Sequence, residues 1–165
     1  VTFSAAIAAS SGVGAWARAL DLLQEMRRSN LVVELITYNA ALSACDNGGQ
    51  WQHVLPLLVE MRQRGLLPDV ITCNTVISSC EKIGAWRQAL GFLAFMQQKR
   101  LEANVITCNA AISACGKGME WQQALYMLAE MQRSTLKSDV VTCNAAVSAC
   151  EKGSEWHQAL MLLAE

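Results

Sequence analysis

Four asparagines recur at intervals of 35 residues and could hydrogen-bond the edges of nucleobases: Asn39, Asn74, Asn109 and Asn144. A carboxamide has donors and an acceptor on one planar group, which suits it to reading a base edge. A second polar side chain follows the first three asparagines after 30 residues: Asp69, Asn104 and Asp139. Because the two polar positions repeat with the same period, we predict that each pair of side chains together recognises one unit of a repeating ligand. The alternative is structural, because asparagine near a helix start often bonds local backbone and could cap or brace the neighbouring helix.

Three lysines keep the same period further along the same helices: Lys82, Lys117 and Lys152. At about 100° per residue, Ile71, Asn74, Ser78 and Lys82 share one helix face. This stripe is too polar to be core, and a nucleic-acid phosphate chain could run past its lysines. As isolated surface lysines they would carry no functional meaning. Asn47 takes the place of the lysine in the second repeat.

The histidines and cysteines do not form a catalytic or metal-binding pattern. His53 and His157 follow tryptophans, away from any carboxylate pair, and are expected to be solvent-exposed. Six of the seven cysteines form three pairs with members seven residues apart, and Cys45 is the remaining member of the series. On a helix that spacing is a rise of about 10 Å, too long for a disulfide and unlike the short spacing of paired zinc ligands. We expect buried, reduced cysteines in a reducing compartment, with no catalytic residue, metal or cofactor.

Composition sets broad limits on partners. The net charge of −1 argues mildly against nucleic acid, although one face of a repeat array can be basic while another is acidic. The chain is 53% hydrophobic but has no uninterrupted apolar run of the length that a membrane span needs. It begins inside a repeat motif, without a basic, serine-rich leader, and stops in mid-repeat. We expect a window from a longer array and no membrane partner.

The elements that position these residues follow from the period. Tryptophans also stand 35 residues apart, at Trp16, Trp51, Trp86, Trp121 and Trp156. A fixed period of this length is typical of stacked supersecondary units. In the reference unit, helical spacing of apolar residues predicts one helix over 70–82 and a second over 85–98. The chain is therefore expected to be all-α, with helix-turn-helix units at about 1–34, 35–69, 70–104, 105–139 and 140–165.

The opposite helix faces are predicted to form the core. Cys73, Ile77 and Cys80 lie across the first helix from the polar stripe. Trp86 shares a stripe with Leu90 and Leu93, which favours packing between units over stacking on bases. Pro56 falls inside a second helix, where proline removes a backbone donor and is expected to kink the helix at a cost of about 3 kcal/mol.

Four motifs together resemble the pentatricopeptide repeat family over the whole chain. They are Val/Ile-Thr-Tyr/Cys-Asn at the start of the unit, Cys-Glu-Lys-x-Gly at residues 80–84, Trp-x-x-Ala-Leu-x-x-Leu-x-x-Met in the second helix, and the linker at residues 65–70. The tetratricopeptide alternative fits less well, since its tryptophan lies in the first helix. The resemblance implies a right-handed superhelical α-solenoid that binds single-stranded RNA, one base per repeat.

The resemblance also implies a role for individual residues. Asn39 with Asp69 would favour U, Asn74 with Asn104 would favour C with U tolerated, and Asn109 with Asp139 would favour U. Asn144 suggests a pyrimidine, so that the predicted core is U-C/U-U-Y, and Ser4 with Glu34 has no assignment. Each base would be sandwiched by an aliphatic residue: Ile36, Ile71, Ile106 or Val141.

Two classes of function remain open. The leading hypothesis is a sequence-selective RNA-binding module that is not an enzyme, serving organellar RNA processing, stability, editing or translation. The alternative is a protein–protein interaction scaffold, and protein partners could also act through a longer parent chain. The repeated asparagines, with the aromatics kept in second helices, favour RNA. Family resemblance implies a mitochondrial or plastid location.

Overall fold

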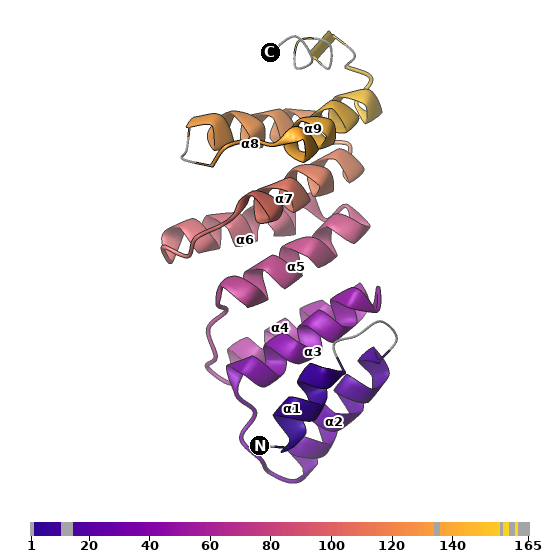
Figure 1. Ribbon diagram of the computed structural model, residues 1–165, viewed down its shortest axis with the longest axis vertical. Helices are drawn as coiled ribbons and strands as arrows, with labels where there is room; N and C mark the ends of the chain where they lie inside the picture. The colour runs from indigo at the N-terminus through magenta and orange to yellow at the C-terminus, as the bar shows by residue number, and fades with distance from the viewer. Residues whose placement is uncertain (1, 11–14, 134–135, 156, 159–160, 162–165) are drawn as a thin grey trace. The chain divides into compact units, whose positions relative to one another are not determined.

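The computed structural model describes residues 2–10, 15–133, 136–155, 157, 158 and 161, and within them it contains nine α-helices and no strand (Figure 1). The all-α prediction is confirmed. The helices are α1 (Thr2–Ala9), α2 (Trp16–Arg28), α3 (Leu35–Asn47), α4 (Trp51–Gln63), α5 (Val70–Ile83), α6 (Trp86–Gln98), α7 (Val105–Lys117), α8 (Trp121–Arg133) and α9 (Val140–Lys152). The predicted right-handed superhelix and the predicted repeat boundaries stay predictions.

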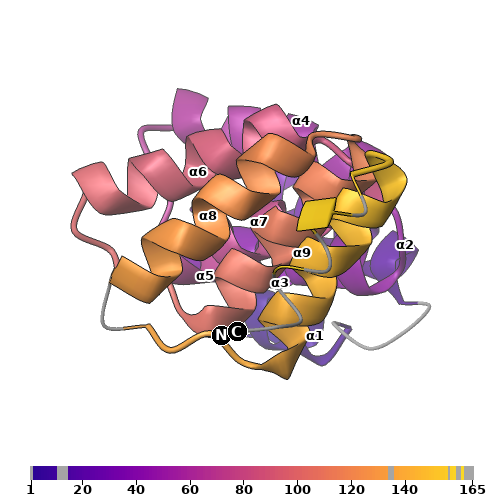
Figure 2. The ribbon, with the colours of Figure 1, turned by 90° about the horizontal axis from the view of Figure 1, so that it is seen from above.

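Two compact units divide the chain, residues 1–79 and 80–165, so that α5 begins in the first and ends in the second. In the first unit, α2 packs against α1 and α3, and α3 packs against α4. In the second unit, α7 contacts α6, α8 and α9 (Figure 2). Both units therefore place helices beginning with Val or Leu against helices beginning with Trp.

Local sequence explains where two of the first helices, α7 and α9, begin. Asn104 and Asp139 have extended backbone at the N-cap, and each side chain accepts a hydrogen bond from the backbone N–H three residues on. Thr107 and Thr142 complete reciprocal capping boxes by bonding back to the N-cap N–H. Such a cap satisfies donors that a helix start otherwise leaves unpaired.

The core uses the helix faces that the sequence predicts. In the second unit it joins Cys108, Ile112 and Cys115 of α7 to Leu128 and Met131 of α8. All described cysteines are free, and all except the half-buried Cys143 are buried. Desolvation raises the pKa of four thiols to about 11: Cys45, Cys73, Cys80 and Cys115. These are packing residues held as thiols, as predicted.

Tryptophan packs between successive repeats. The ring of Trp86 lies so close to Gly118 that a Cβ added there would overlap it, and Trp121 stands in the same relation to Gly153. Trp16 and Gly48 repeat the arrangement in the first unit. The prediction of packing between units is confirmed for these three. The ring of Trp86 is half-buried rather than fully buried, and Trp156 lies outside the described residues.

Pro56 lies inside a second helix, as predicted. Helix α4 continues through it and keeps the 13-residue length of the other second helices, and the predicted kink stays a prediction. The expectation that both histidines are exposed holds for only one of them. The ring of His53 is half-buried and stacks on Trp16, with centroids 5.7 Å apart, whereas His157 is exposed as expected.

Candidate nucleic-acid interface

The first asparagine of the predicted set lies in a three-residue hydrogen-bond network within the first unit. Asn39 Nδ2 donates to both carboxylate oxygens of Asp69 at 3.0 Å. Thr72 Oγ1 donates to Asn39 Oδ1 at 2.6 Å, and Asp69 Oδ1 accepts from the Thr72 backbone N–H at 2.8 Å. Asn39 is only 6% exposed. The structure therefore brings the predicted pair together and adds a threonine from the start of the next repeat.

The same network recurs 70 residues later, within the second unit. Asn109 Nδ2 donates to Asp139 Oδ1 at 3.2 Å, and Thr142 Oγ1 donates to Asn109 Oδ1 at 2.6 Å. The Asp139 carboxylate again caps the helix, through the backbone N–H of Thr142 at 2.8 Å. Asn109 is half-buried and Asp139 is exposed. Bracing of the next helix, the structural alternative, is thus a real property of both asparagines, and base reading stays a prediction.

The hydrogen bonds fix which way each amide points. Thr72 and Thr142 present a hydroxyl hydrogen to the asparagine oxygen, while the aspartates can only accept, so the asparagine nitrogen must face the carboxylate. Asn109 keeps a second N–H beyond the one given to Asp139, whereas Asn39 Nδ2 faces both oxygens of Asp69. A donor and an acceptor consequently lie next to each other on every Asn–Asp pair.

Asn104, which stands where Asp69 and Asp139 stand in their repeats, presents a hydrogen-bond donor instead of an acceptor. Its Oδ1 accepts from the Thr107 backbone N–H at 2.9 Å and lies 2.8 Å from Thr107 Oγ1. The amide nitrogen therefore points away from the cap, and the exposed side chain offers N–H donors. Its predicted partner, Asn74, lies in the first unit and is half-buried, and Asn144 is exposed.

The predicted sandwiching residues are exposed aliphatic side chains. Relative exposures are 66% for Ile36, 57% for Ile71, 77% for Ile106 and 60% for Val141. A single exposed isoleucine is ordinary on a protein surface. Here an exposed aliphatic side chain recurs three residues before each asparagine, and none of the four is buried in the core.

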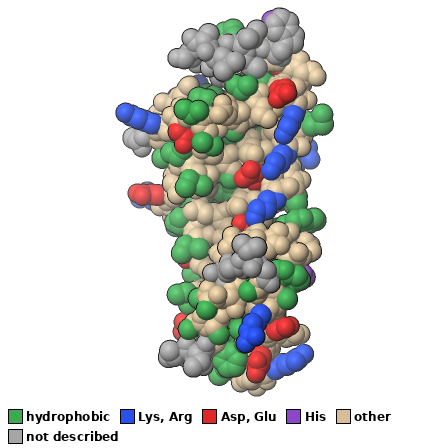
Figure 3. Space-filling model, turned by 45° about the vertical axis from the view of Figure 1, so that its right-hand side comes forward, with side chains coloured by type: hydrophobic (Ala, Val, Ile, Leu, Met, Phe, Trp, Pro, Cys, Tyr) green, Lys and Arg blue, Asp and Glu red, His purple; other side chains and the backbone are tan. Residues whose placement is uncertain are grey.

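The predicted lysines lie beside acidic side chains. Lys117 Nζ is 3.5 Å from Glu81 Oε1, which also accepts a hydrogen bond from Ser113 Oγ at 3.0 Å. Lys82 and Lys152 are exposed. In the upper half of Figure 3, basic side chains are spaced along one edge of the second unit with acidic side chains near them. This part of the surface is a mixed row of charges.

Serine residues of the polar stripe are occupied by contacts between repeats. Ser78 and Ser79 donate to the two carboxylate oxygens of Asp46, at 2.9 and 2.7 Å. Asp46 is only 8% exposed, and it stands one repeat before Glu81. Ser78 and its equivalent Ser113 thus bind an acidic residue of the preceding repeat, and the helical wheel could not show this.

Threonine is the member of the network that sequence reasoning missed. Thr37, Thr72, Thr107 and Thr142 are all buried, although threonine is a polar residue. In the first repeat, the hydroxyl of Ser4 lies 2.9 Å from Thr37 Oγ1, in the place that asparagine takes elsewhere. The available signal was the threonine that stands two residues before every asparagine.

The described part of the chain meets neither of two further requirements, those of a metal site and of a membrane span. Within the described ranges, no three histidine, cysteine, aspartate or glutamate side chains come together as a metal site would require. Among the same residues, no helix combines the length and hydropathy needed to cross a membrane.

The architecture and the network, which is found in two of the repeats, define a helical-repeat protein. Models of the PPR repeat family match residues 68–117, a model of the pentatricopeptide repeat domain matches 21–81, and a PPR repeat model matches 1–31 and 106–136. The chain belongs to the pentatricopeptide repeat family. No individually curated protein sequence matches it.

Solved structures agree on the fold. The pentatricopeptide repeat protein PPR10, in complex with an 18-nt psaJ RNA element, is 31% identical with a TM-score of 0.72, over 98% of this chain and 23% of that one. A second structure, of PPR10 from maize, is 23% identical, with a TM-score of 0.71, over 99% of this chain and 23% of that one. The PPR domain of Arabidopsis thaliana protein-only RNase P 1, in complex with tRNA, is 14% identical, with a TM-score of 0.74, over 88% and 79%. The chain thus spans about a quarter of the length of PPR10.

Proposed function

We propose that this chain binds single-stranded RNA with one base per repeat and without chemistry of its own. The observation that supports this most is the Asn–Asp–Thr network, repeated at Asn39 and Asn109 with the same polarity. A helix cap alone needs only the aspartate and the threonine. The asparagine adds an oriented amide next to the carboxylate, three residues after an exposed aliphatic side chain.

The oriented pair matches the edge of uracil. Uracil has a donor at N3–H beside carbonyl acceptors, and an Asn–Asp pair has a carboxylate acceptor beside an amide donor. Asn39 with Asp69 and Asn109 with Asp139 would each form two complementary hydrogen bonds with that edge. Hydrogen bonds to a charged group contribute about 1.5–3 kcal/mol, enough to favour uracil over a base with the wrong pattern.

The amide polarity of Asn104 fits cytosine instead. Cytosine has an acceptor at N3, which a carboxylate would repel and an N–H would satisfy. Because the oxygen of Asn104 is engaged at its own helix cap, the group left to the ligand is a donor. The repeat of Asn74 and Asn104 would therefore favour C, and the four repeats from Asn39 to Asn144 would read U-C/U-U-Y.

The remaining predicted contacts surround the base edges. Ile36, Ile71, Ile106 and Val141 would sandwich bases between successive repeats, which gives their exposure a purpose. Lys82, Lys117 and Lys152 would contact phosphates. Lys117 would exchange or share its partner Glu81 in doing so.

A single substitution tests the code within this chain. Asp139→Asn should retain the helix cap, because Asn104 already caps α7 in the same way, but it replaces an acceptor by a donor. Fluorescence anisotropy with labelled U-C-U-U and U-C-C-U RNAs should show the preferred third base changing from U to C. The matched control is Glu151→Gln, which also removes one negative charge from α9 but lies at its end.

The outcomes separate base reading from charge. If both variants raise the affinity for all RNAs by the same factor, and this increase disappears in high salt, the contacts are with phosphate only. If neither variant changes the order of affinities, the network is purely structural. An A-G-A-A RNA and the DNA counterpart of U-C-U-U complete the set, and both should bind more weakly than U-C-U-U RNA.

Family membership also motivates a proposed cellular setting. The protein would act in a mitochondrion or a plastid, in RNA processing, stability, editing or translation. Fractionation of cells that express the full-length protein with an epitope tag tests the location, and recovery outside both organelles would refute it.

A further inference from the structure

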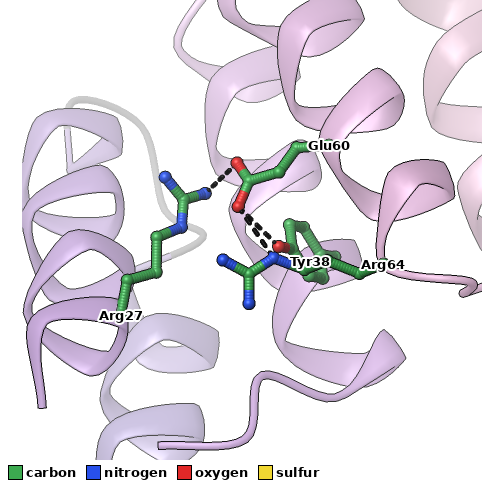
Figure 4. Close-up of polar contacts among 4 residues, drawn as sticks. All are labelled: Arg27, Tyr38, Glu60 and Arg64. Atoms are coloured by element: carbon green, nitrogen blue, oxygen red, sulfur yellow. Dashed lines mark hydrogen bonds and ion pairs between the residues drawn. The ribbon is translucent and has the colours of Figure 1, made fainter. Parts of the chain in front are cut away.

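A buried tyrosine joins an ion-pair cluster between α2 and α4 of the first unit. Tyr38 is fully buried, and its hydroxyl donates to Glu60 Oε1 at 2.8 Å. The other oxygen of Glu60 pairs with Arg27 at 2.5 Å, and Arg64 Nε lies 3.1 Å from Glu60 Oε1 (Figure 4). Burial, followed by the hydrogen bond to Glu60, raises the pKa of Tyr38 to about 12. The aromatic ring fills the space between two second helices, and its hydroxyl ends on a carboxylate.

The second unit lacks these groups at the same positions, 70 residues further on. Cys108 stands in the register of Tyr38, Gln97 in that of Arg27, and Ala103 in that of Val33. Ala94 similarly replaces Gln24. A pocket of about 410 Å³ lies where this volume is missing, between α6 and α8, and Cys108, Gln97, Ala103 and Ala94 all line it.

The second unit keeps the carboxylate that accepts the tyrosine hydrogen bond in the first unit. Glu130 stands in the register of Glu60 and also lines the pocket, and it forms an ion pair with the largely exposed Arg133 at 2.8 Å. The other walls include Leu93, Met127 and Met131. A mainly apolar pocket, lined also by Gln97, Gln123 and one carboxylate, therefore occupies the position whose equivalent in the first unit a tyrosine fills.

We propose that this pocket binds a tyrosine side chain of a partner protein. The volume falls within the range of about 300–1,000 Å³ that is typical of ligand pockets. The first unit shows which group fits, an aromatic ring whose hydroxyl donates to the glutamate. A protein partner is favoured over a small molecule by the rim, where Tyr126 is 58% exposed beside Met127, since tyrosine and methionine are enriched at protein interfaces. The proposal is independent of RNA binding.

The test uses 4-methylphenol, which is the tyrosine side chain as a free molecule, with toluene as the phenylalanine counterpart. In protein labelled with ¹³C-methyl methionine, 4-methylphenol should shift the Met127 and Met131 signals and leave the fully buried Met61 of the first unit unchanged. It should bind about fivefold more tightly than toluene, the equivalent of one hydrogen bond. Glu130→Ala should remove this difference while leaving toluene binding in place.

Two variants should block the pocket. Cys108→Tyr supplies the ring from within the chain and should abolish the shifts while raising the melting temperature. Ala94→Gln introduces the glutamine that the first unit has at the equivalent position. Because Ala94 is exposed, this variant should fold and can test whether filling the pocket blocks binding even if Cys108→Tyr does not fold. RNA binding should be unchanged in Ala94→Gln. Equal affinities for 4-methylphenol and toluene in the unaltered protein would overturn the assignment, as would shifts that persist in both variants.

A last comparison distinguishes a protein from a small-molecule source. Acetyl-Gly-Tyr-Gly-amide should cause the same methyl shifts as 4-methylphenol, and acetyl-Gly-Phe-Gly-amide should bind more weakly. If the phenol binds but the tyrosine peptide does not, the pocket is closed to a side chain on a peptide backbone, and the proposed protein partner is wrong.

Discussion

Replacing Thr72 by valine should reveal how strongly one hydroxyl couples two successive repeats. Thr72 is fully buried, and its Oγ1 lies 2.6 Å from Asn39 Oδ1 and 3.3 Å from the Asp69 backbone N–H. Valine keeps the shape of threonine and replaces the hydroxyl by a methyl group. The variant therefore deletes polar contacts without opening a cavity.

The expected loss follows from those contacts. A typical hydrogen bond contributes about 1 kcal/mol net, and a buried group that loses its partner costs about 1–3 kcal/mol. Asn39 Oδ1 would lose its donor in a residue that is 6% exposed, whereas the Asp69 N–H lies at a half-buried helix start that water can reach. We expect Thr72→Val to lower the free energy of unfolding by about 2 kcal/mol.

A matched substitution on the same helix provides the control. Thr75 Oγ1 donates only to the Ile71 backbone carbonyl, at 2.9 Å. That bond returns to a carbonyl of its own helix and supports no other repeat, so Thr75→Val should change stability by less than about 0.5 kcal/mol. Urea titrations followed by far-UV circular dichroism measure both values under the same conditions.

A double-mutant cycle then isolates the pair. Residues in direct contact show coupling energies of about 0.5–3 kcal/mol, so Asn39→Ala should cost less in the Thr72→Val background than in the unaltered chain. Equal losses for Thr72→Val and Thr75→Val, or additive effects of Thr72→Val and Asn39→Ala, would refute the reasoning. Weaker discrimination of uracil at the first predicted base should accompany the stability loss.

Three other predictions concern ionisation, thiols and backbone. Hydrogen bonds from Thr142, of which the backbone N–H has the largest effect, lower the pKa of Asp139 below its ordinary value of 3.8. The ionised carboxylate therefore stabilises the fold fully at pH values above 3.8, and this stabilisation is lost as the pH falls through the pKa of the folded state. A carboxyl ¹³C titration should therefore place Asp139 below that ordinary value, and uracil preference at its repeat should be constant from pH 5 to 8. Cys45, Cys73, Cys80 and Cys115, each with its pKa raised to about 11, should not react with Ellman's reagent at pH 8 until urea unfolds the chain; rapid reaction in the native state would contradict their burial. Gly118→Ala should cost about 1–3 kcal/mol, because its Cβ would overlap Trp86, whereas Gly91→Ala within α6 meets no atom and should stabilise by about 0.5–1 kcal/mol; thermal melts compare the two, and equal shifts would refute the packing argument.

The helices were largely predictable from the sequence, because their determinants are local and repeated. Apolar spacing predicted helices over 70–82 and 85–98, and the structure has α5 at Val70–Ile83 and α6 at Trp86–Gln98. The burial of the cysteines followed from the same spacing. The pairing of Asn39 with Asp69 and of Asn109 with Asp139 was also predictable, since both members keep the period of the array. The place of Pro56 inside a second helix also followed from the period, and the predicted kink stays a prediction.

Tertiary structure alone decided how those residues use their polar groups. Whether an asparagine presents its nitrogen or its oxygen depends on which partner lies opposite, and Thr72 lies 33 residues from Asn39. Local spacing does not contain that information. The pocket beside Cys108 is decided in the same way, because an empty volume depends on side chains from α6, α7 and α8 together. The sequence by itself thus determined the repeat and its helices, while the packing of successive repeats determined the donors, acceptors and spaces that a ligand would meet.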